Sequence, residues 1–140
     1  KKKDSESSST KLKKGKVTGI GGVFFKTTDC KATKDWYKNN LGFNTDDYGC
    51  TFWWQDKNGE KAATQWSPFD EKTDYFNPSK KDFMFNYRVE NLVELLEELK
   101  EKGVQVINKI EEFDYGKFGW ILDLDGNKIE LWEPKDESTL

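Results

Sequence analysis

Hydrophobic and polar side chains alternate along residues 120–134 on both sides of a short polar turn, which predicts a β-hairpin. The turn is Asp125-Gly126-Asn127, and the strands run from Trp120 to Leu124 and from Lys128 to Glu133. Successive side chains of a strand point to opposite faces. On the second strand, Ile129 and Leu131 therefore form the predicted core face. The opposite face carries Lys128, Glu130 and Trp132.

The stretch before this hairpin predicts a strand, a helix and a second strand. Leucines recur at helical spacing on one face, at Leu92, Leu95, Leu96 and Leu99. Asn91 is the expected N-cap, with Glu94 as its capping-box partner. Gly103 is expected to end the helix. The flanking strands are predicted at 82–89 and 104–110, and a Gly/aromatic loop at 111–119.

The first half of the chain shows a similar order. A strand is predicted at 17–26, and a helix follows that Asp29 caps and Gly42 ends. Further strands are predicted at 44–48, 50–55 and 60–67, with a hairpin turn at 56–59.

The order strand-helix-strand-strand-strand is thus predicted twice, in unit one (17–67) and unit two (82–134). The alternative is an α+β domain whose halves are similar by accident, but the matching caps, stop glycines and hairpins favour duplication. Residues 68–81 are expected to be a polar linker, 1–16 a disordered Lys/Ser-rich tail, and 135–140 a C-terminal tail.

Charge and composition restrict the possible functions. Residues 1–16 hold seven Lys against two acidic residues, and the remaining residues carry 16 basic against 24 acidic side chains, a net charge of −8. An acidic body argues against nucleic acid as the main partner and mildly favours neutral or cationic small ligands. The chain has no His, which excludes Ser-His-Asp and Cys-His catalysis and every His-ligated metal site.

Cys30 and Cys50 show no metal-binding spacing, so free thiols are expected, with a single disulfide as the alternative. The longest apolar runs are only a few residues, so no transmembrane segment is predicted. Location stays open: cytoplasmic is the default, and a secreted or lipid-anchored bacterial protein is the alternative. The Lys/Ser tail and a first residue other than Met motivate that alternative.

Three stretches carry a resemblance to a known superfamily: GGVFFKTTD with WYKNNLGF, DFMFNYRVEN with LKEKGV, and WILDLDGNKIELWEP. Over residues 17–134 the chain resembles the vicinal oxygen chelate superfamily, which includes glyoxalase I, bleomycin-resistance proteins and extradiol dioxygenases. The resemblance implies two tandem βαβββ units that form an open sheet wrapped around a cleft, with the helices outside. It also implies a small-molecule site in that cleft.

Metal-dependent members of this superfamily bind their metal at four recurrent positions. Counting back the same distance from the helix caps Asp29 and Asn91 reaches Gly22 and Met84, where His is common in metal-binding members. The other two positions fall on Gln65 and Glu130. One carboxylate and one amide cannot hold a divalent ion tightly, so we expect no metal and no other cofactor.

Glu130 is the strongest candidate for a catalytic or ligand-binding residue. As a functional group it would be a general base or a hydrogen-bond acceptor for a ligand, and the alternative is an inherited position that is salt-bridged or solvated. Six tryptophans in a chain with few aliphatic residues predict an aromatic-lined pocket, although each of them alone could serve packing. The ligand-binding candidates are Gln65, Met84, Trp120, Trp132, Trp66, whichever of Trp53 and Trp54 points inward, and Tyr115 as a lid residue.

Two functions are compatible with these features of the sequence. One is a metal-free binding module for a small aromatic or cationic molecule, as in bleomycin-resistance proteins. The other is a lyase, isomerase or dioxygenase-type enzyme that uses Glu130 as a base or metal ligand. The lack of His and the glycine at position 22 favour the binding module. A homodimer would fit either function.

Overall fold

The computed structural model describes residues 14–135, so the predictions for 1–13 and 136–140 lie outside the described residues. Its strands form one sheet of seven strands in the order β2-β3-β1-β4-β7-β6-β5. Among residues 14–135, no helix has the length and hydrophobicity to span a membrane. The elements are β1 (Lys16–Thr27), α2 (Cys30–Leu41), β2 (Cys50–Gln55), β3 (Lys61–Asp70), β4 (Phe83–Glu90), α3 (Leu92–Glu101), β5 (Val106–Phe113), β6 (Gly116–Leu122) and β7 (Lys128–Pro134).

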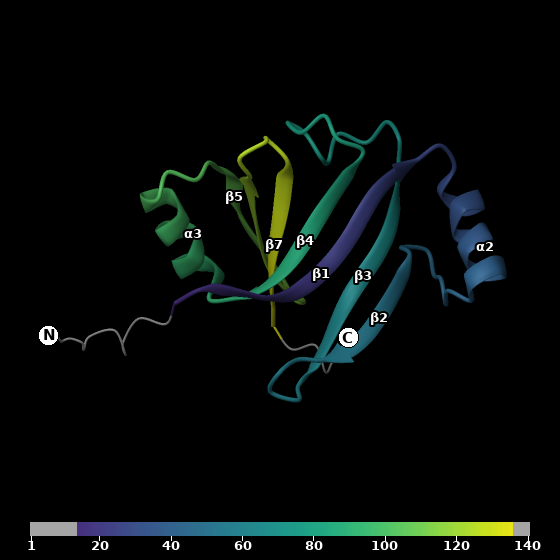
Figure 1. The fold of residues 1–140 in the computed structure, drawn as a ribbon, viewed down its shortest axis with the longest axis horizontal. Coiled ribbons are helices and arrows are strands. Elements are labelled where there is room, and N and C mark those ends of the chain that lie inside the picture. The colour runs from purple at the N-terminus through teal and green to yellow at the C-terminus, as the bar shows by residue number, and fades with distance from the viewer. Residues whose placement is uncertain (1–13, 136–140) are drawn as a thin grey trace, which may run out of the picture.

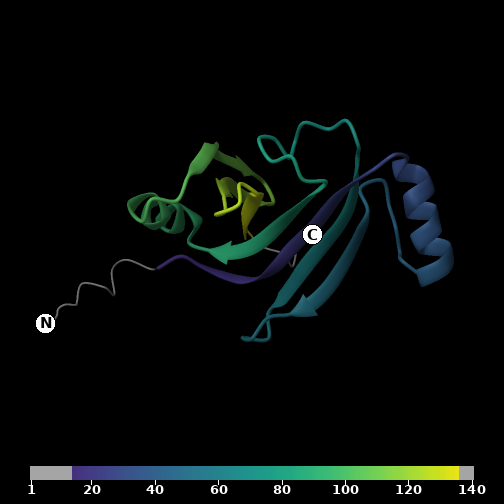
Figure 2. The ribbon, with the colours of Figure 1, turned by 45° about the horizontal axis from the view of Figure 1, so that its top comes forward.

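The two units meet where β1 pairs with β4 in antiparallel fashion, and each of these strands pairs in parallel with the last strand of its own unit. Figure 1 shows the sheet with α2 beyond one end and α3 beyond the other. The turned view in Figure 2 shows that the sheet is curved and open, with both helices outside. The predicted α+β fold with an open sheet is therefore confirmed.

Helix α2 begins and ends where the sequence predicts. Asp29 accepts a hydrogen bond from the Ala32 amide, 3.0 Å away, and so caps the first turn. Gly42 takes the left-handed conformation, with φ of 75°, which lets the chain leave the helix without a Cβ clash.

Helix α3 packs its leucine face on the outer side of the sheet. Leu92 and Leu96 form a core cluster with Val89 and Leu131, and Leu95 and Leu99 pack against it. The predicted apolar face is therefore confirmed, and it explains why β7 needs apolar side chains at every second position.

The predicted capping box of α3 is wrong. Asn91 has φ of 58° and makes no side-chain cap; its amide group donates instead to the Lys14 carbonyl. The Leu92 amide donates to Glu133 Oε1 at 2.9 Å, so a carboxylate from the end of β7 caps the helix. A carboxylate at this end also stabilises the helix dipole.

Two other predictions need correction. Residues 44–48 form no strand, and only a single bridge links Thr45 to Cys50. The reason is that the Asp46 side chain accepts hydrogen bonds from the backbone amides of Tyr48 and Gly49, which turns the chain sharply. Residues 111–119 are not a loop, since β5 and β6 continue through them as a hairpin.

Residues 68–81 are an ordered part of the fold rather than a polar linker. Strand β3 continues to Asp70 beside β1, which keeps Pro68 within a parallel pair. Phe76 is fully buried and forms a second core cluster with Phe24 and Met84, against which Phe69 packs. We refer to residues 71–82 as the crossing segment, because they carry the chain from β3 to β4 (Figure 1).

Candidate functional site

One row of aligned residues crosses the face of the sheet that lies opposite the helices, here called the inner face. The strand registers align six positions from β2 to β6, namely Thr51, Gln65, Gly22, Asn86, Glu130 and Trp120. Alternation separates this row from Leu131, which packs against α3. The row therefore joins polar groups of both units across the middle of the sheet.

Glu130 is the one residue of this row that carries an acidic side chain. Its side chain is 3% exposed, and both carboxylate oxygens accept hydrogen bonds. Asn86 Nδ2 donates to Oε1 at 2.7 Å, and Trp120 Nε1 donates to Oε2 at 2.9 Å. The Tyr75 hydroxyl donates to Oε2 as well. Three neutral donors thus surround a buried carboxylate, an arrangement that stabilises its charge.

Tyr75 reaches Glu130 from the crossing segment. Its ring stacks on Phe69, with 5.8 Å between the centroids, and Lys128 Nζ donates to its carbonyl at 2.6 Å. Burial and the adjacent Glu130 charge raise the pKa of the Tyr75 phenol well above its usual value. Burial also lowers the pKa of Lys128, although the Glu130 charge opposes that change. Tyr75 therefore stays a neutral donor that covers the carboxylate.

Gln65 occupies the corresponding place in unit one. Its Oε1 accepts from Thr51 Oγ1 at 2.7 Å, and its Nε2 donates to Ser67 Oγ at 3.2 Å. Trp53 lies on the same face of the sheet and is 45% exposed. The Lys61 ammonium sits 4.1 Å from the centroid of a Trp53 ring. Unit one therefore offers an amide and an accessible indole.

The register of the paired strands shows that one of the four predicted metal-ligand positions is wrong. Gly22 lies opposite Asn86, whereas Met84 lies opposite Phe24 and packs, 1% exposed, in the crossing-segment core. Counting from the caps failed because β4 passes into α3 through fewer residues than β1 into α2, with Asn91 alone, in the left-handed conformation, between β4 and α3. The sequence missed Asn86, although a lone amide between Phe85 and Tyr87 was a signal of a polar inner face.

The four aligned positions are Gln65, Gly22, Asn86 and Glu130, and these residues do not fit a transition-metal centre. They offer two amides and one carboxylate, which already accepts three hydrogen bonds from protein donors. Within residues 14–135, no three or more His, Cys, Asp or Glu side chains are grouped so that they could hold a metal ion. At Gly22, the Phe24 ring fills the space, since an added Cβ would lie 2.6 Å from its Cζ.

Two predicted ligand-binding tryptophans lie elsewhere. Trp66 is 9% exposed and packs against Tyr37 of α2 and against Phe43, so it belongs to the core under that helix. Trp54 alternates with Trp53 on β2, and its Nε1 donates to Thr64 at 2.8 Å. Between the two β2 tryptophans, Trp53 is therefore the one that shares a face with Gln65.

The remaining aromatic candidates lie in unit two. Trp132 is 8% exposed and shares the face of Glu130, as alternation predicted. Its ring stacks on Phe118, and its Nε1 donates to the Tyr115 carbonyl at 3.2 Å. Tyr115 is 47% exposed in the β5–β6 turn and stacks on Phe113. Its role as a lid stays a prediction.

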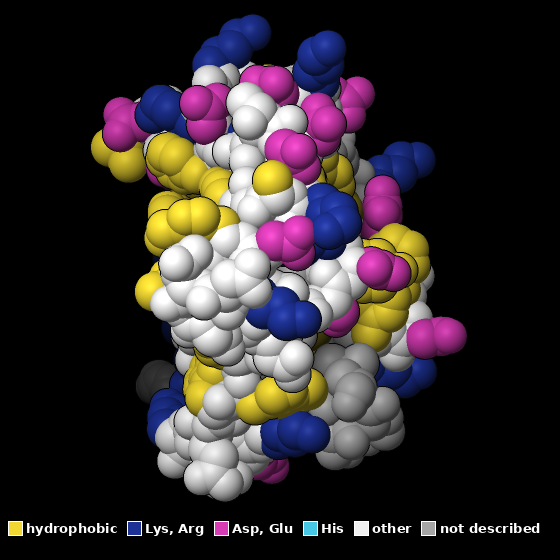
Figure 3. All heavy atoms as spheres, turned by 90° about the vertical axis from the view of Figure 1, so that its right-hand side faces the viewer, with side chains coloured by type: hydrophobic (Ala, Val, Ile, Leu, Met, Phe, Trp, Pro, Cys, Tyr) yellow, Lys and Arg dark blue, Asp and Glu magenta, His cyan; other side chains and the backbone are white. Residues whose placement is uncertain are grey.

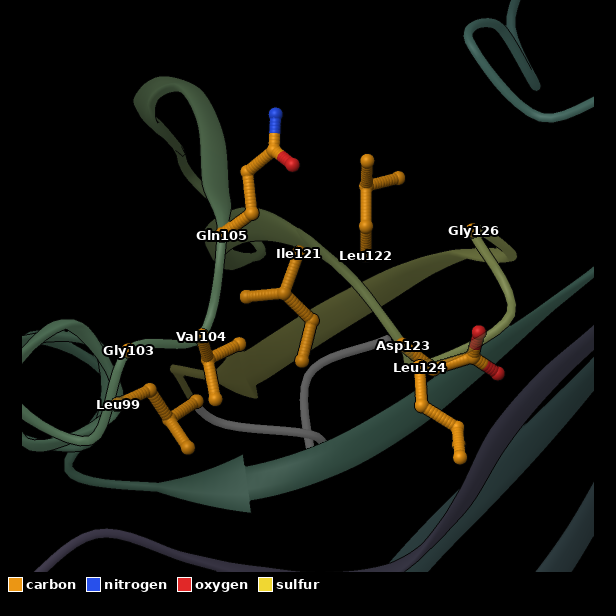
Figure 4. Close-up of a pocket in the computed structure, with 9 residues that line it drawn as sticks. All are labelled: Leu99, Gly103, Val104, Gln105, Ile121, Leu122, Asp123, Leu124 and Gly126. Carbon is orange, nitrogen blue, oxygen red and sulfur yellow. The ribbon is translucent and has the colours of Figure 1, made fainter.

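Sequence reasoning gave no sign of Tyr75, because nothing in the polar crossing segment marks a side chain that returns to the sheet. The structure also has a hollow of about 600 Å³ away from Glu130 (Figure 4). It lies between the end of α3 and the β6–β7 turn, and Leu99, Val104 and Ile121 form an apolar group within it. Leu124 lies at its edge and is 95% exposed.

Comparison with known proteins gives one consistent result. The model of the Glyoxalase/Bleomycin resistance protein/Dioxygenase superfamily matches residues 19–131. No curated protein matches the chain.

Solved structures with a similar fold include methylmalonyl-CoA epimerase from Mycobacterium tuberculosis, 21% identical with a TM-score of 0.60 over 88% of this chain and 92% of that chain. The Streptomyces coelicolor methylmalonyl-CoA epimerase in complex with 2-nitronate-propionyl-CoA is 14% identical, with a TM-score of 0.65 over 85% and 99%. A superfamily member from Vibrio splendidus 12B01 is 12% identical, with a TM-score of 0.53 over 81% and 97%. At these identities the likeness shows the fold alone.

Proposed function

Because the chain belongs to the Glyoxalase/Bleomycin resistance protein/Dioxygenase superfamily, we propose that it binds a small organic molecule on its inner face without a metal. The observation that carries this proposal is the aligned row Gln65, Gly22, Asn86 and Glu130. Amides and a carboxylate bind ligands through hydrogen bonds, whereas this set lacks the ligands that a divalent metal requires.

The surroundings of Trp53 indicate the chemistry of the ligand. The exposed indole already attracts one cation, because the Lys61 ammonium lies 4.1 Å from its ring centroid. Residues 17–140 carry a net charge of −8, which raises the local concentration of cationic molecules. The proposed ligand is therefore an organic cation with an aromatic or apolar body, which stacks on Trp53 in place of Lys61.

The test is a titration of the full chain with a panel of aromatic amines and quaternary ammonium compounds, followed by tryptophan fluorescence. A binding compound should lose at least ~10-fold in affinity with Trp53→Phe, since the stronger cation-binding ring is removed. Trp36→Phe is the matched control, because Trp36 is 56% exposed on α2, on the outer side of the sheet. Equal losses in both variants, or no binding by any compound, would reject the proposal.

A second candidate function is an enzyme that uses Glu130 as a general base. The observation in its favour is the Tyr75 hydroxyl, which covers Glu130 and would expose the carboxylate if the crossing segment moved. Such an enzyme would exchange a proton next to a carbonyl group. Since two structural neighbours are methylmalonyl-CoA epimerases, methylmalonyl-CoA is a reasonable probe. Deuterium uptake into it from D₂O that Glu130→Gln abolishes would favour the enzyme.

A further inference from the structure

The residues just before β1 lie in direct contact with helix α3. The Asn91 side-chain amide donates a hydrogen bond to the Lys14 carbonyl at 3.0 Å. Gly15 lies so close to the helix that an added Cβ would be 2.4 Å from Leu95 Cβ and 2.5 Å from the Asn91 carbonyl oxygen. A side chain at position 15 would push this segment away from α3, whereas glycine lets the backbone approach the helix closely.

The position of Gly15 brings the C-terminal end of α3 within reach of the residues that precede it. Leu99 lies four residues beyond Leu95 on the same helix, about 6 Å further along the axis. Leu12 is three residues from Gly15, so its Cα can lie up to about 10 Å away. Because Leu99 lines the hollow of about 600 Å³, Leu12 is close enough to enter that hollow.

This hollow has apolar walls. Leu99, Val104 and Ile121 form the apolar group within it (Figure 4), and Leu124 borders it with 95% of its side chain exposed. The exposure of Leu124 is built into its turn, because the Asp123 carboxylate accepts the amides of residues 125 and 127, each at 2.9 Å. An apolar side chain that enters the hollow would remove apolar surface from water on both sides of the contact.

The charges of the two partners are complementary. Helix α3 has four Glu against one Lys in ten residues. The Asp123 carboxylate lines the hollow, and the hydrogen bonds that it accepts from Asn127 lower its pKa and keep it ionised. Residues 1–16 hold seven Lys against two acidic residues, and Lys11 and Lys13 flank Leu12. Leu12 is also the only aliphatic or aromatic side chain in those sixteen residues.

The α2 end of the molecule exposes apolar side chains too, among them Trp36 at 56% and Leu41 at 58%. Figure 3 shows that face, where hydrophobic side chains lie among basic and acidic ones. Helix α2 lies beyond one end of the sheet and α3 beyond the other (Figure 1). Because Gly15 lies against α3, the short reach of Leu12 includes the hollow and excludes the α2 face.

From these observations we infer that Leu12 packs into the hollow at the end of α3, with Lys11 and Lys13 beside the acidic groups around it. The segment before β1 then acts as a strap that joins this strand to α3 and to the β6–β7 turn. One apolar side chain cannot build a core of its own, but a preformed hollow needs only one. Neither Glu130 nor Trp53 lines the hollow, so the strap does not depend on the proposed ligand.

Methyl NMR of the full chain, with labelled Leu, Val and Ile methyl groups, tests this inference. We expect nuclear Overhauser effects between Leu12 and the methyl groups of Val104 and Ile121. Leu12→Ser should shift the methyl signals of Leu99, Val104 and Ile121 and leave that of Leu41 on α2 unchanged. Signals around the hollow that are the same in the wild type and in Leu12→Ser would overturn the inference.

Thr10→Ser is the matched control, since it lies in the same segment and keeps both Leu12 and the lysines. It should shift none of the hollow signals, and shifts as large as those of Leu12→Ser would overturn the assignment to Leu12. Raising NaCl to ~1 M shortens the screening length to about 3 Å and should weaken the effects between Leu12 and the hollow. Effects that do not change with salt would overturn the role of Lys11 and Lys13.

Two further measurements identify the occupant of the hollow. In a mixture of differently labelled chains, an effect between Leu12 of one chain and Ile121 of another would overturn the intramolecular strap in favour of a second copy. The small aliphatic probe 1-hexanol should shift the hollow signals more in Leu12→Ser than in the wild type, because Leu12 excludes it. Equal shifts in both proteins would show that the hollow is open to free ligands, and would also overturn the inference.

Discussion

The Tyr75 hydroxyl donates a hydrogen bond to Glu130, although the two residues are 55 positions apart in the sequence. Tyr75 belongs to the crossing segment and Glu130 to the last strand, so the contact ties the connection between the units to the sheet. Lys128 lies two residues before Glu130 on β7, and its Nζ donates a hydrogen bond to the backbone carbonyl of the same tyrosine.

Removing this hydroxyl should destabilise the protein. We expect Tyr75→Phe to lower the free energy of unfolding by about 1–3 kcal/mol, because it deletes a hydrogen bond to a buried charged group. Denaturant unfolding measures the change. Tyr48→Phe is the control, since Tyr48 is 79% exposed and should change stability very little. Equal stability of the wild type and Tyr75→Phe would show that the bond contributes nothing.

Tyr75 should also stay un-ionised at a pH that ionises an ordinary phenol. Its pKa is raised in the folded state, so the stability that it supplies is complete below the usual pKa of 10.0 and is lost as pH rises further. Lys128, whose pKa is lowered, affects stability in the opposite sense. Absorbance at alkaline pH detects only phenols and separates the two groups. Near pH ~11, native Tyr75→Phe and wild type should show equal phenolate absorbance.

The same two proteins should differ by one tyrosine, out of five in the wild type, once both are unfolded at that pH. A native wild type that already shows one more phenolate than Tyr75→Phe near pH ~11 would mean that solvent reaches Tyr75 freely.

Two variants test whether the N-terminus of α3 is capped by Glu94, which is close in the sequence, or by Glu133 at the end of β7. Glu133→Ala should cost about 0.5–2 kcal/mol in unfolding free energy, because the Leu92 amide loses its acceptor. Glu94→Ala, at the position that a capping box would use, should cost much less. Thermal unfolding of both variants measures the two losses of stability. A larger loss in Glu94→Ala than in Glu133→Ala would show that Glu94, and not Glu133, caps the helix.

The core between α3 and the sheet should be sensitive to truncation on one helix face only. Leu96 is 4% exposed and packs with Val89 and Leu131, so Leu96→Ala should cost about 2–5 kcal/mol. Val93 lies on the same helix and is 38% exposed, and Val93→Ala should cost well under half as much. Similar losses in both variants by denaturant unfolding would contradict the assigned packing.

Added metal should leave the melting curve unchanged. At a metal concentration of about 100 times its dissociation constant, binding to a functional metal site would add about 2.7 kcal/mol to the free energy of unfolding. The aligned positions supply two amides and one carboxylate that already accepts three protein hydrogen bonds, so Ni²⁺, Zn²⁺ and Mn²⁺ should give no such shift. Thermal unfolding with each ion and with a chelator checks this, and a stabilisation of that size would show that other residues bind the metal.

The sequence by itself determined the features that depend on near neighbours in the chain. Alternation at Lys128–Glu133 fixed which side chains share a face, since the period of a strand is a local property. The leucine spacing fixed the buried face of α3, and Asp29 and Gly42 fixed the ends of α2, because caps and turns involve residues only a few positions apart.

Only the tertiary structure decided which distant groups meet. The pairing of β4 with β1 and β7 placed Asn86 rather than Met84 between Gly22 and Glu130. The crossing segment brought Tyr75 to Glu130, and the end of β7 brought Glu133 to α3. These contacts depend on sheet order and on how each segment returns to the sheet, which no local pattern in the chain encodes.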